Sequence, residues 1–250
     1  NRGPFLAMNP FSSRCCQHNH AQGWPYYSEH LILATPDNGA AIALYAACKA
    51  TLKVADGQEI TLHEQTNYPF EEKISFTVNT TEDVRFPFYL RIPSWCDQPE
   101  LAINGKQKKI DPIPGKYIYI DRTWTDGDKV ELNLPMKLSI RTWQVNKNSV
   151  SVNYGPLTLS LKINEEYIQK DSRSTAIYDS RWQEGANATQ WPSYEIFPKS
   201  LWNYALVLDS KVPLKNFKVI RKEWPSDNFP FTVSNVPLEV KAIGKQIPSW

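Results

Sequence analysis

The two adjacent cysteines near the start of the sequence, Cys15 and Cys16, are the residues best suited to chemistry. Neighbouring residues hold their Cα atoms about 3.8 Å apart, and a normal disulfide needs a wider separation, so the pair is unsuited to bonding to itself. Two thiolates can instead bind one soft metal ion, and zinc prefers such ligands. A thiolate kept ionised by a metal is also a competent nucleophile. The pair therefore indicates a zinc site or a nucleophile, and the plainer alternative is two buried, inert thiols.

Two histidines, His18 and His20, follow the cysteines in the segment Arg-Cys-Cys-Gln-His-Asn-His at 14–20. The Cys-x-x-His spacing of Cys15 and His18 is compatible with a shared zinc ion. Together with Trp24, whose ring is suited to stacking on a sugar, the histidines are candidate substrate-binding residues. The alternative makes the histidines loop or helix-cap residues and places Trp24 on a buried helix face. The letters His-Asn-His do not indicate a nuclease, because the basic surroundings of such a site are missing.

The charge of the sequence argues against a nucleic-acid partner. Its formal net charge is +2, and its lysines and arginines are scattered rather than gathered into runs. No apolar stretch approaches the roughly 20 residues that a membrane helix needs, so no membrane partner is expected. The first ten residues lack a start methionine and a signal-peptide pattern, which is typical of the interior of a longer protein. Cysteine usage leaves the compartment open, with a periplasmic or secreted location favoured over the cytoplasm.

Hydrophobic periodicity predicts one helix followed by many strands. Residues 21–34 have helical spacing, and Pro25 is suited to the first turn of that helix. From residue 40 onward, short segments alternate polar and apolar residues between turns such as Asn104-Gly105. Strands repeating every 8–12 residues or so, with no helices between them, are typical of an antiparallel sandwich. The polar segment 165–194 has no clear period and is expected to be a long loop.

Most aromatic and acidic residues of the strand-rich part have plain structural interpretations. Asp126 and Asp128 flank a glycine between two strands, which is turn chemistry rather than an acid–base pair. The tryptophans in strand-like segments are expected in the sandwich core, namely Trp95, Trp124 and Trp143. Those in or near the polar segment are the better candidates for an exposed aromatic platform, namely Trp182, Trp191 and Trp202.

The cysteine segment and a series of later motifs together resemble glycoside hydrolase family 127, the β-L-arabinofuranosidase family. The resemblance covers about residues 10–165, with the motifs in the same order. These motifs are Cys15-Cys16-Gln-His-Asn19, Gly23-Trp-Pro-Tyr26, Tyr68-Pro-Phe70, Leu90-Arg-Ile-Pro-Ser-Trp95, Ile103-Asn-Gly105, Tyr117-Ile-Tyr-Ile-Asp-Arg-Thr-Trp124, Asp126-Gly-Asp128, Leu134-Pro-Met136 and Tyr154-Gly-Pro-Leu157.

The resemblance implies a mainly β fold in which the end of an (α/α)6 barrel, one helix here, is followed by two antiparallel β-sandwich domains. Residues 1–34 would be the C-terminal remnant of the helical catalytic barrel, 35–136 the first sandwich and 137–250 the second. The resemblance also implies that Cys15 is both nucleophile and zinc ligand, and that Cys16 is a second ligand. A third cysteine, a glutamate ligand and the acid/base glutamate would lie upstream, in a barrel that this chain would contact.

The expected function is therefore that of the C-terminal part of a retaining glycoside hydrolase acting on L-arabinofuranosides or related plant-glycan sugars. The substrate is a carbohydrate, the cofactor is zinc, and the 250-residue chain is expected to be inactive alone. The alternative is a non-catalytic carbohydrate-binding or architectural module, which would be indifferent to alkylation of Cys15. A further alternative is a protein that has the family's fold but not its catalytic activity, because Gln17 and His18 stand where the family resemblance leads us to expect Pro-Pro.

Overall fold

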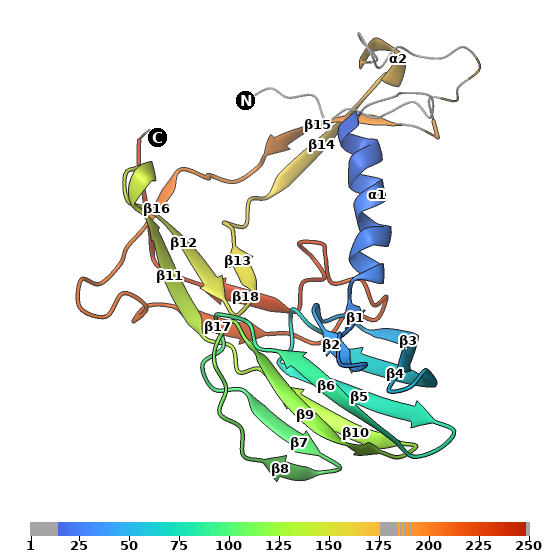
Figure 1. Cartoon of the computed structure of the whole chain (residues 1–250). Coiled ribbons are helices and arrows are strands. Elements are labelled where there is room, and N and C mark those ends of the chain that lie inside the picture. Colours follow the sequence, from blue (N-terminus) through green and yellow to red (C-terminus); the bar gives the residue numbers. More distant parts are fainter. Residues whose placement is uncertain (1–14, 176–184, 186, 188, 191, 249–250) are drawn as a thin grey trace. The chain divides into compact units, whose positions relative to one another are not determined.

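The computed structural model describes residues 15–175, 185, 187, 189–190 and 192–248, with only the backbone described for 15–21 and 175 (Figure 1). The described fold is mainly β, as the sequence predicts, and begins with the helix α1 (Cys15–Glu29). The chain forms two compact units. The larger contains residues 27–160 and 208–241, and the smaller contains the described parts of 1–26, 161–207 and 242–250.

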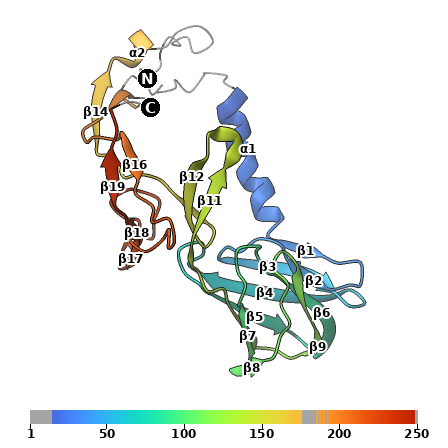
Figure 2. The ribbon, with the colours of Figure 1, turned by 90° about the vertical axis from the view of Figure 1, so that its left-hand side faces the viewer.

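The larger unit contains a β-sandwich of two facing sheets (Figures 1 and 2). One sheet has the order β1-β2-β6-β9, and its strands are β1 (Ile32–Ala34), β2 (Ala40–Ile42), β6 (Val84–Arg91) and β9 (Tyr117–Trp124). The other has the order β3-β4-β5-β10-β7-β8, and its strands are β3 (Cys48–Val54), β4 (Gln58–Thr66), β5 (Lys73–Thr80), β10 (Asp128–Asn133), β7 (Glu100–Ile103) and β8 (Lys106–Lys108). The pairing is antiparallel as expected, except that β2 runs parallel to β6.

The sandwich core follows from the alternation of residues along the strands. On β6, Phe86 and Phe88 are fully buried between the sheets, while the intervening Pro87 faces outward. Phe88 packs against Phe76 and Trp124, and Phe86 against Trp124, at ring-centroid distances of 5.6–5.8 Å. The Trp124 indole N–H donates to the Phe86 carbonyl oxygen at 3.0 Å, so its one polar group is satisfied in the core.

A second, smaller core lies in the same unit. Its buried members are Phe70, Met136, Tyr154 and Leu238. They hold a three-stranded sheet and a strand pair, formed by β11 (Leu138–Trp143), β12 (Ser149–Tyr154), β13 (Leu157–Leu159), β17 (Lys218–Arg221) and β18 (Leu238–Lys241). The 3-10 turn η1 (Gln144–Asn146) joins β11 to β12, and this hairpin extends away from the sandwich in both views (Figures 1 and 2).

The smaller unit consists of α1 as far as Tyr26, the short helix α2 (Ser172–Thr175) and two strand pairs. The pairs are β14 (Glu165–Lys170) with β15 (Ser193–Pro198), and β16 (Tyr204–Leu206) with β19 (Gly244–Gln246). The expectation of a long loop over 165–194 is therefore wrong at its start and its end. All six residues of β14 are exposed, so the strand has no alternation of burial that its sequence could reveal.

The predicted helix over 21–34 is displaced in the structure. The helix runs over Cys15–Glu29, so Pro25 lies inside it rather than in its first turn. Residues Ile32–Ala34 form β1 instead, paired with β2 across the turn at 35–39. Their apolar run fits a helix face and a short strand equally well, and pairing with β2 decides between the two.

Candidate functional site

The cysteine pair stands at the beginning of α1. Cys15 and Cys16 are its first two residues, and His18 and His20 follow within its first two turns. The side chains of these four residues lie outside what the structure describes. Their roles as nucleophile, zinc ligands and substrate contacts therefore stay predictions that rest on the sequence.

Trp24, Tyr26 and Tyr27 are exposed on the second half of α1. Their exposed fractions are 61%, 65% and 42%, so the alternative that places Trp24 on a buried helix face is wrong. Glu29 ends the helix two residues after Tyr27, and the chain then turns into β1. The role of Trp24 as a substrate contact stays a prediction that rests on the sequence.

The other two cysteines of the chain are poor metal ligands. Cys96 is fully buried, and burial raises the pKa of its thiol. Burial and the neighbouring Glu64 carboxyl raise the pKa of Cys48 to about 11, so this thiol is protonated at neutral pH. Among the side chains that the structure describes, no group of three or more His, Cys, Asp or Glu is placed to hold a metal ion.

The acidic pair Asp126 and Asp128 belongs to a turn, as the sequence predicts. Asp126 accepts hydrogen bonds from the Asn79 side chain at 3.1 Å and the Thr80 N–H at 3.2 Å. Asp128 is buried, which by itself would raise its pKa. Hydrogen bonds from Thr125 and Asn104, together with Arg122, outweigh this and hold the pKa below its usual value. Asp128 thus closes the β9–β10 turn, and Asp126 ties that turn to the end of β5.

The sandwich itself matches a known family. The family model described as "Beta-L-arabinofuranosidase, GH127 middle domain" matches residues 39–136, which run from the start of β2 through β10. This match confirms the resemblance to glycoside hydrolase family 127. No curated protein matches the chain.

Solved GH127 structures share the fold. A GH127 beta-L-arabinofuranosidase from Geobacillus stearothermophilus T6 aligns with a TM-score of 0.55 at 22% identity, over 78% of this chain and 36% of that one. A second structure, described as a glycoside hydrolase, aligns with a TM-score of 0.55 at 20% identity, over 75% of this chain and 37% of that one. A GH127 beta-arabinofuranosidase aligns with a TM-score of 0.52 at 21% identity, over 83% and 36%. This chain therefore spans little more than a third of the length of these structures.

Several residues of the GH127-like motifs have structural roles. Tyr68 and Trp95 pack against both hydrophobic cores of the larger unit, and Phe70 is buried in the smaller core. Trp124 forms the centre of the sandwich. These motifs therefore identify the scaffold, and among the motif residues the cysteine pair remains the candidate for chemistry.

Among the described carboxyl groups of the GH127-like sandwich, Glu64 has a pKa well above its ordinary value. Its side chain is fully buried, and this burial raises its pKa to about 8, although the Ala46 N–H donates to Oε1 at 3.1 Å and favours the charged form. Cys48 Sγ lies 4.0 Å from Oε2. A carboxyl without exposed surface cannot meet a sugar, so we assign Glu64 a structural role.

The tryptophan predictions have mixed outcomes. Trp124 is in the core as expected, and Trp95 is half-buried against both cores. Trp143 is 39% exposed, so its assignment to the core is wrong: it ends β11, where no residue is buried, and its ring is covered by the Arg141 guanidinium at 3.7 Å. Trp202 is 47% exposed. Trp182 and Trp191 lie outside the described residues.

Sequence reasoning missed one polar assembly, which lies beside β1 and β2. It joins Thr35, Asp37 and Tyr89 by hydrogen bonds and borders a hollow on the surface of the larger unit. Thr35 and Asp37 have the sequence pattern of turn residues, and Tyr89 lies 52 positions beyond Asp37. The one signal in the sequence was the alternation that puts Tyr89 on the outer face of β6.

Proposed function

We propose that these residues are the C-terminal part of a retaining glycoside hydrolase that acts on L-arabinofuranosides or related plant-glycan sugars. The observation that supports this most is the match of residues 39–136 to the GH127 middle domain, ten residues after the end of a helix that begins with Cys15 and Cys16. The family match, the position of the cysteine pair before the matched residues and the chemistry expected of two adjacent thiols all favour this proposal.

In the proposed reaction, Cys15 replaces one of the two carboxylates that most retaining glycosidases use. The Cys15 thiolate attacks the anomeric carbon, so a C–S bond forms as the bond from that carbon to the leaving oxygen breaks. A carboxyl acid, which the family resemblance places outside these residues, protonates the leaving oxygen. The resulting carboxylate then takes a proton from water, whose oxygen attacks the same carbon and releases the Cys15 thiolate. Two inversions leave the configuration of the sugar unchanged.

Zinc, when bound, would keep sulfur ionised and stabilise it as a leaving group at neutral pH. Cys15 and Cys16 would hold it, with further ligands from the rest of the longer protein. The described thiols of Cys48 and Cys96 cannot substitute, because burial raises both pKa values. Since the acid/base group and the other ligands are expected elsewhere, we expect the 250-residue chain to be inactive by itself.

The test is hydrolysis of a panel of aryl L-arabinofuranosides and related glycosides by the longer protein. Cys15→Ala is expected to lower kcat by about 1,000-fold or more, as removal of a nucleophile does. Cys48→Ala is the matched control, because it removes a protonated thiol on β3 and should leave kcat unchanged. Equal activity of Cys15→Ala and the unaltered protein would overturn the assignment of the nucleophile. If the unaltered protein hydrolyses no glycoside of the panel, this would count against L-arabinofuranosides and related sugars as its substrates.

A further inference from the structure

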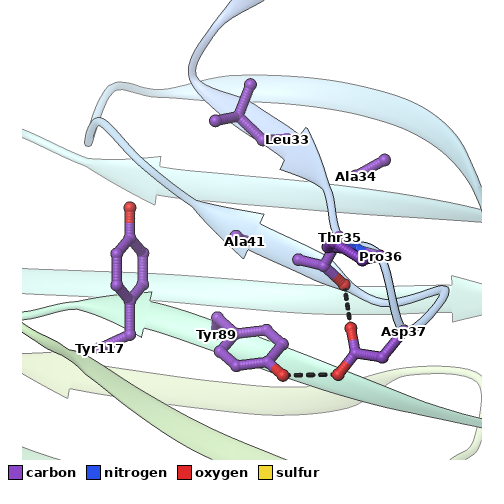
Figure 3. Close-up of a pocket in the computed structure, with 8 residues that line it drawn as sticks. All are labelled: Leu33, Ala34, Thr35, Pro36, Asp37, Ala41, Tyr89 and Tyr117. Carbon is purple, nitrogen blue, oxygen red and sulfur yellow. Dashed lines mark hydrogen bonds between the residues drawn. The ribbon is translucent and has the colours of Figure 1, made fainter.

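The outer face of the four-stranded sheet contains a hollow of about 590 Å³ beside the β1–β2 turn (Figure 3). We call it the Asp37 hollow, and it is lined by Leu33, Ala34, Thr35, Pro36, Asp37, Ala41, Tyr89 and Tyr117. All of these residues belong to the larger unit. The volume falls within the roughly 300–1,000 Å³ that is usual for small-molecule sites.

The register of the sheet explains why the surface is hollow there. Leu33 pairs with Ala41, Ala41 with Tyr89 and Tyr89 with Tyr119, so these four residues form one row across the outer face. Ala41 is the small member of that row. In Figure 3, Leu33 and Tyr117 stand on two sides of the space above Ala41, and Tyr89 and Asp37 border a third side.

The polar side of the hollow is a fixed hydrogen-bond network. Tyr89 donates its hydroxyl proton to Asp37 Oδ2 at 2.5 Å, and the Thr35 hydroxyl donates to Oδ1. The Gly39 N–H donates to Thr35 Oγ1 at 2.9 Å, which orients the threonine. The two hydroxyl donors lower the pKa of Asp37, and the bond to Asp37 raises the pKa of Tyr89 to about 12. The carboxylate is thus charged and the phenol protonated at neutral pH, and each still has lone pairs for further hydrogen bonds.

The remaining sides are formed by the Tyr117 ring and by the aliphatic side chains of Leu33, Ala34 and Pro36, while Tyr119 is not among the lining residues. Tyr117 and Tyr119 are 44% and 56% exposed, and the Tyr119 ring lies 5.1 Å from that of Tyr89. The nearby carboxylate of Asp121 is already paired with Arg85 through two hydrogen bonds, at 3.0 and 3.2 Å. Among the described residues that line the hollow, Asp37 is therefore the one that carries a charge.

The hollow therefore offers the Asp37 carboxylate, which already accepts two hydroxyl protons, the Tyr89 phenol beside it and the exposed ring of Tyr117. These groups suit a ligand that has adjacent hydroxyl groups and an apolar C–H face. We propose that the Asp37 hollow binds one uncharged sugar unit of a glycan. Hydroxyls of the sugar donate to Asp37, and its C–H face lies on Tyr117. This binding requires neither Cys15 nor zinc. The choice of an arabinofuranoside as first probe rests on the proposed function.

The experiment is isothermal titration of the purified 250-residue chain with methyl β-L-arabinofuranoside, with methyl β-D-xylopyranoside and, as a cationic probe, with choline chloride. Tyr117→Ala removes the exposed ring, Ala41→Leu fills the floor, and Asp37→Asn removes the charge. Tyr167→Ala is the matched control, because it removes a tyrosine that is 58% exposed on β14. The far-ultraviolet circular dichroism of every variant is recorded beside the titration.

Saturable sugar binding is expected, weakened about tenfold in Tyr117→Ala and in Asp37→Asn, abolished in Ala41→Leu and unchanged in Tyr167→Ala. Binding of the xyloside in place of the arabinofuranoside, with the same response to the variants, would support the hollow as a sugar site and count against the proposed substrate class alone. Absence of saturable sugar binding, equal binding by Tyr117→Ala and Tyr167→Ala, or binding of choline alone would overturn the proposal. Hydrolysis by the longer protein is a separate readout, so the failure of either proposal is distinguishable from failure of the other.

Discussion

Arg221 on β17 forms an ion pair with Glu72, 149 residues earlier in the chain, at 3.1 Å between Nη2 and Oε1. The same guanidinium donates to the Tyr154 hydroxyl at 3.0 Å and to the Phe70 carbonyl oxygen at 3.2 Å. Glu72 Oε1 in turn accepts the Met136 N–H at 3.0 Å. One side chain thus ties the last strands of the larger unit to the loop before β5 and to β12.

We predict that Arg221→Lys lowers the free energy of unfolding by about 1–3 kcal/mol, because lysine keeps the charge but cannot reach three acceptors in the planar geometry of a guanidinium. Urea unfolding monitored by fluorescence measures this. Arg173→Lys is the control, since Arg173 is exposed and pairs within its own turn with Asp171. If Arg221→Lys lowers the free energy of unfolding no more than Arg173→Lys does, the hydrogen bonds of Arg221 contribute nothing to stability.

The buried carboxyl of Glu64 predicts that stability falls as the pH rises. Its pKa is about 8 in the folded chain and 4.5 in its ordinary state. Between these values the folded chain keeps a proton that the unfolded chain has lost, so the free energy of unfolding decreases by up to about 1.4 kcal/mol per pH unit from this group. Below pH 4.5 both states are protonated, and above pH 8 both are ionised.

Glu64→Gln should remove this dependence, because the amide cannot ionise and its oxygen can still accept from Ala46. The measurement is the melting temperature of both proteins from about pH 5 to about pH 8.5, which spans the raised pKa. Glu59→Gln on the exposed side of β4 is the control and should keep the slope of the unaltered chain. Parallel curves for Glu64→Gln and the unaltered chain would show that Glu64 does not titrate in this range.

Much of the sandwich was predictable, because its strands alternate buried and exposed residues. The segment 73–78 predicts β5 almost to its ends, and the turn at Asn104-Gly105 separates β7 from β8 as expected. The parallel pairing of β2 with β6 was not predictable, since it depends on contacts between segments that lie far apart in the chain, such as Ala40 with Phe88. The fully exposed β14 has no periodicity to detect.

The two candidate sites, the cysteine pair and the Asp37 hollow, also differ in whether a local sequence pattern indicates them. The cysteine pair is a local signal, because two adjacent thiols by themselves indicate a metal site or a nucleophile. The Asp37 hollow has no local signal: Leu33, Ala41 and Tyr89 become neighbours only through strand register, and the hollow exists because the middle one is small. The alternative that buries Trp24 fails because helical spacing predicts a buried face only where another element covers it.

Gly39 is predicted to tolerate no side chain. A Cβ there would lie 2.2 Å from the Pro87 carbonyl oxygen, a backbone atom that cannot move aside cheaply. Gly39→Ala should therefore destabilise the chain by about 1–3 kcal/mol, in the range of overpacked cores. Gly23→Ala is the control, because a methyl group there would have nothing within 4 Å and alanine favours the helix. Thermal unfolding checks both, and a Gly39→Ala as stable as the unaltered chain would contradict the close approach of β2 to β6.

Cys48 should be almost inert towards iodoacetamide in the folded chain. Its pKa is about 11 instead of 9.0, which lowers the thiolate fraction at neutral pH about 100-fold. Buried Cys96 should be equally protected. Mass spectrometry of peptides after timed alkylation, with and without urea, measures this. Rapid labelling of Cys48 without urea would contradict both the partial burial of its thiol and its raised pKa.

The most direct test of the proposed chemistry is to find the sugar on the sulfur. The longer protein is mixed with an aryl L-arabinofuranoside, quenched in acid within the first turnover and digested, and the peptide that contains Cys15 and Cys16 is weighed and fragmented. We predict a mass increase of one pentosyl unit, located on Cys15 and absent from Cys15→Ala. An adduct on Cys16, or hydrolysis without any adduct on this peptide while Cys15→Ala keeps full activity, would contradict the assignment of Cys15 as the nucleophile.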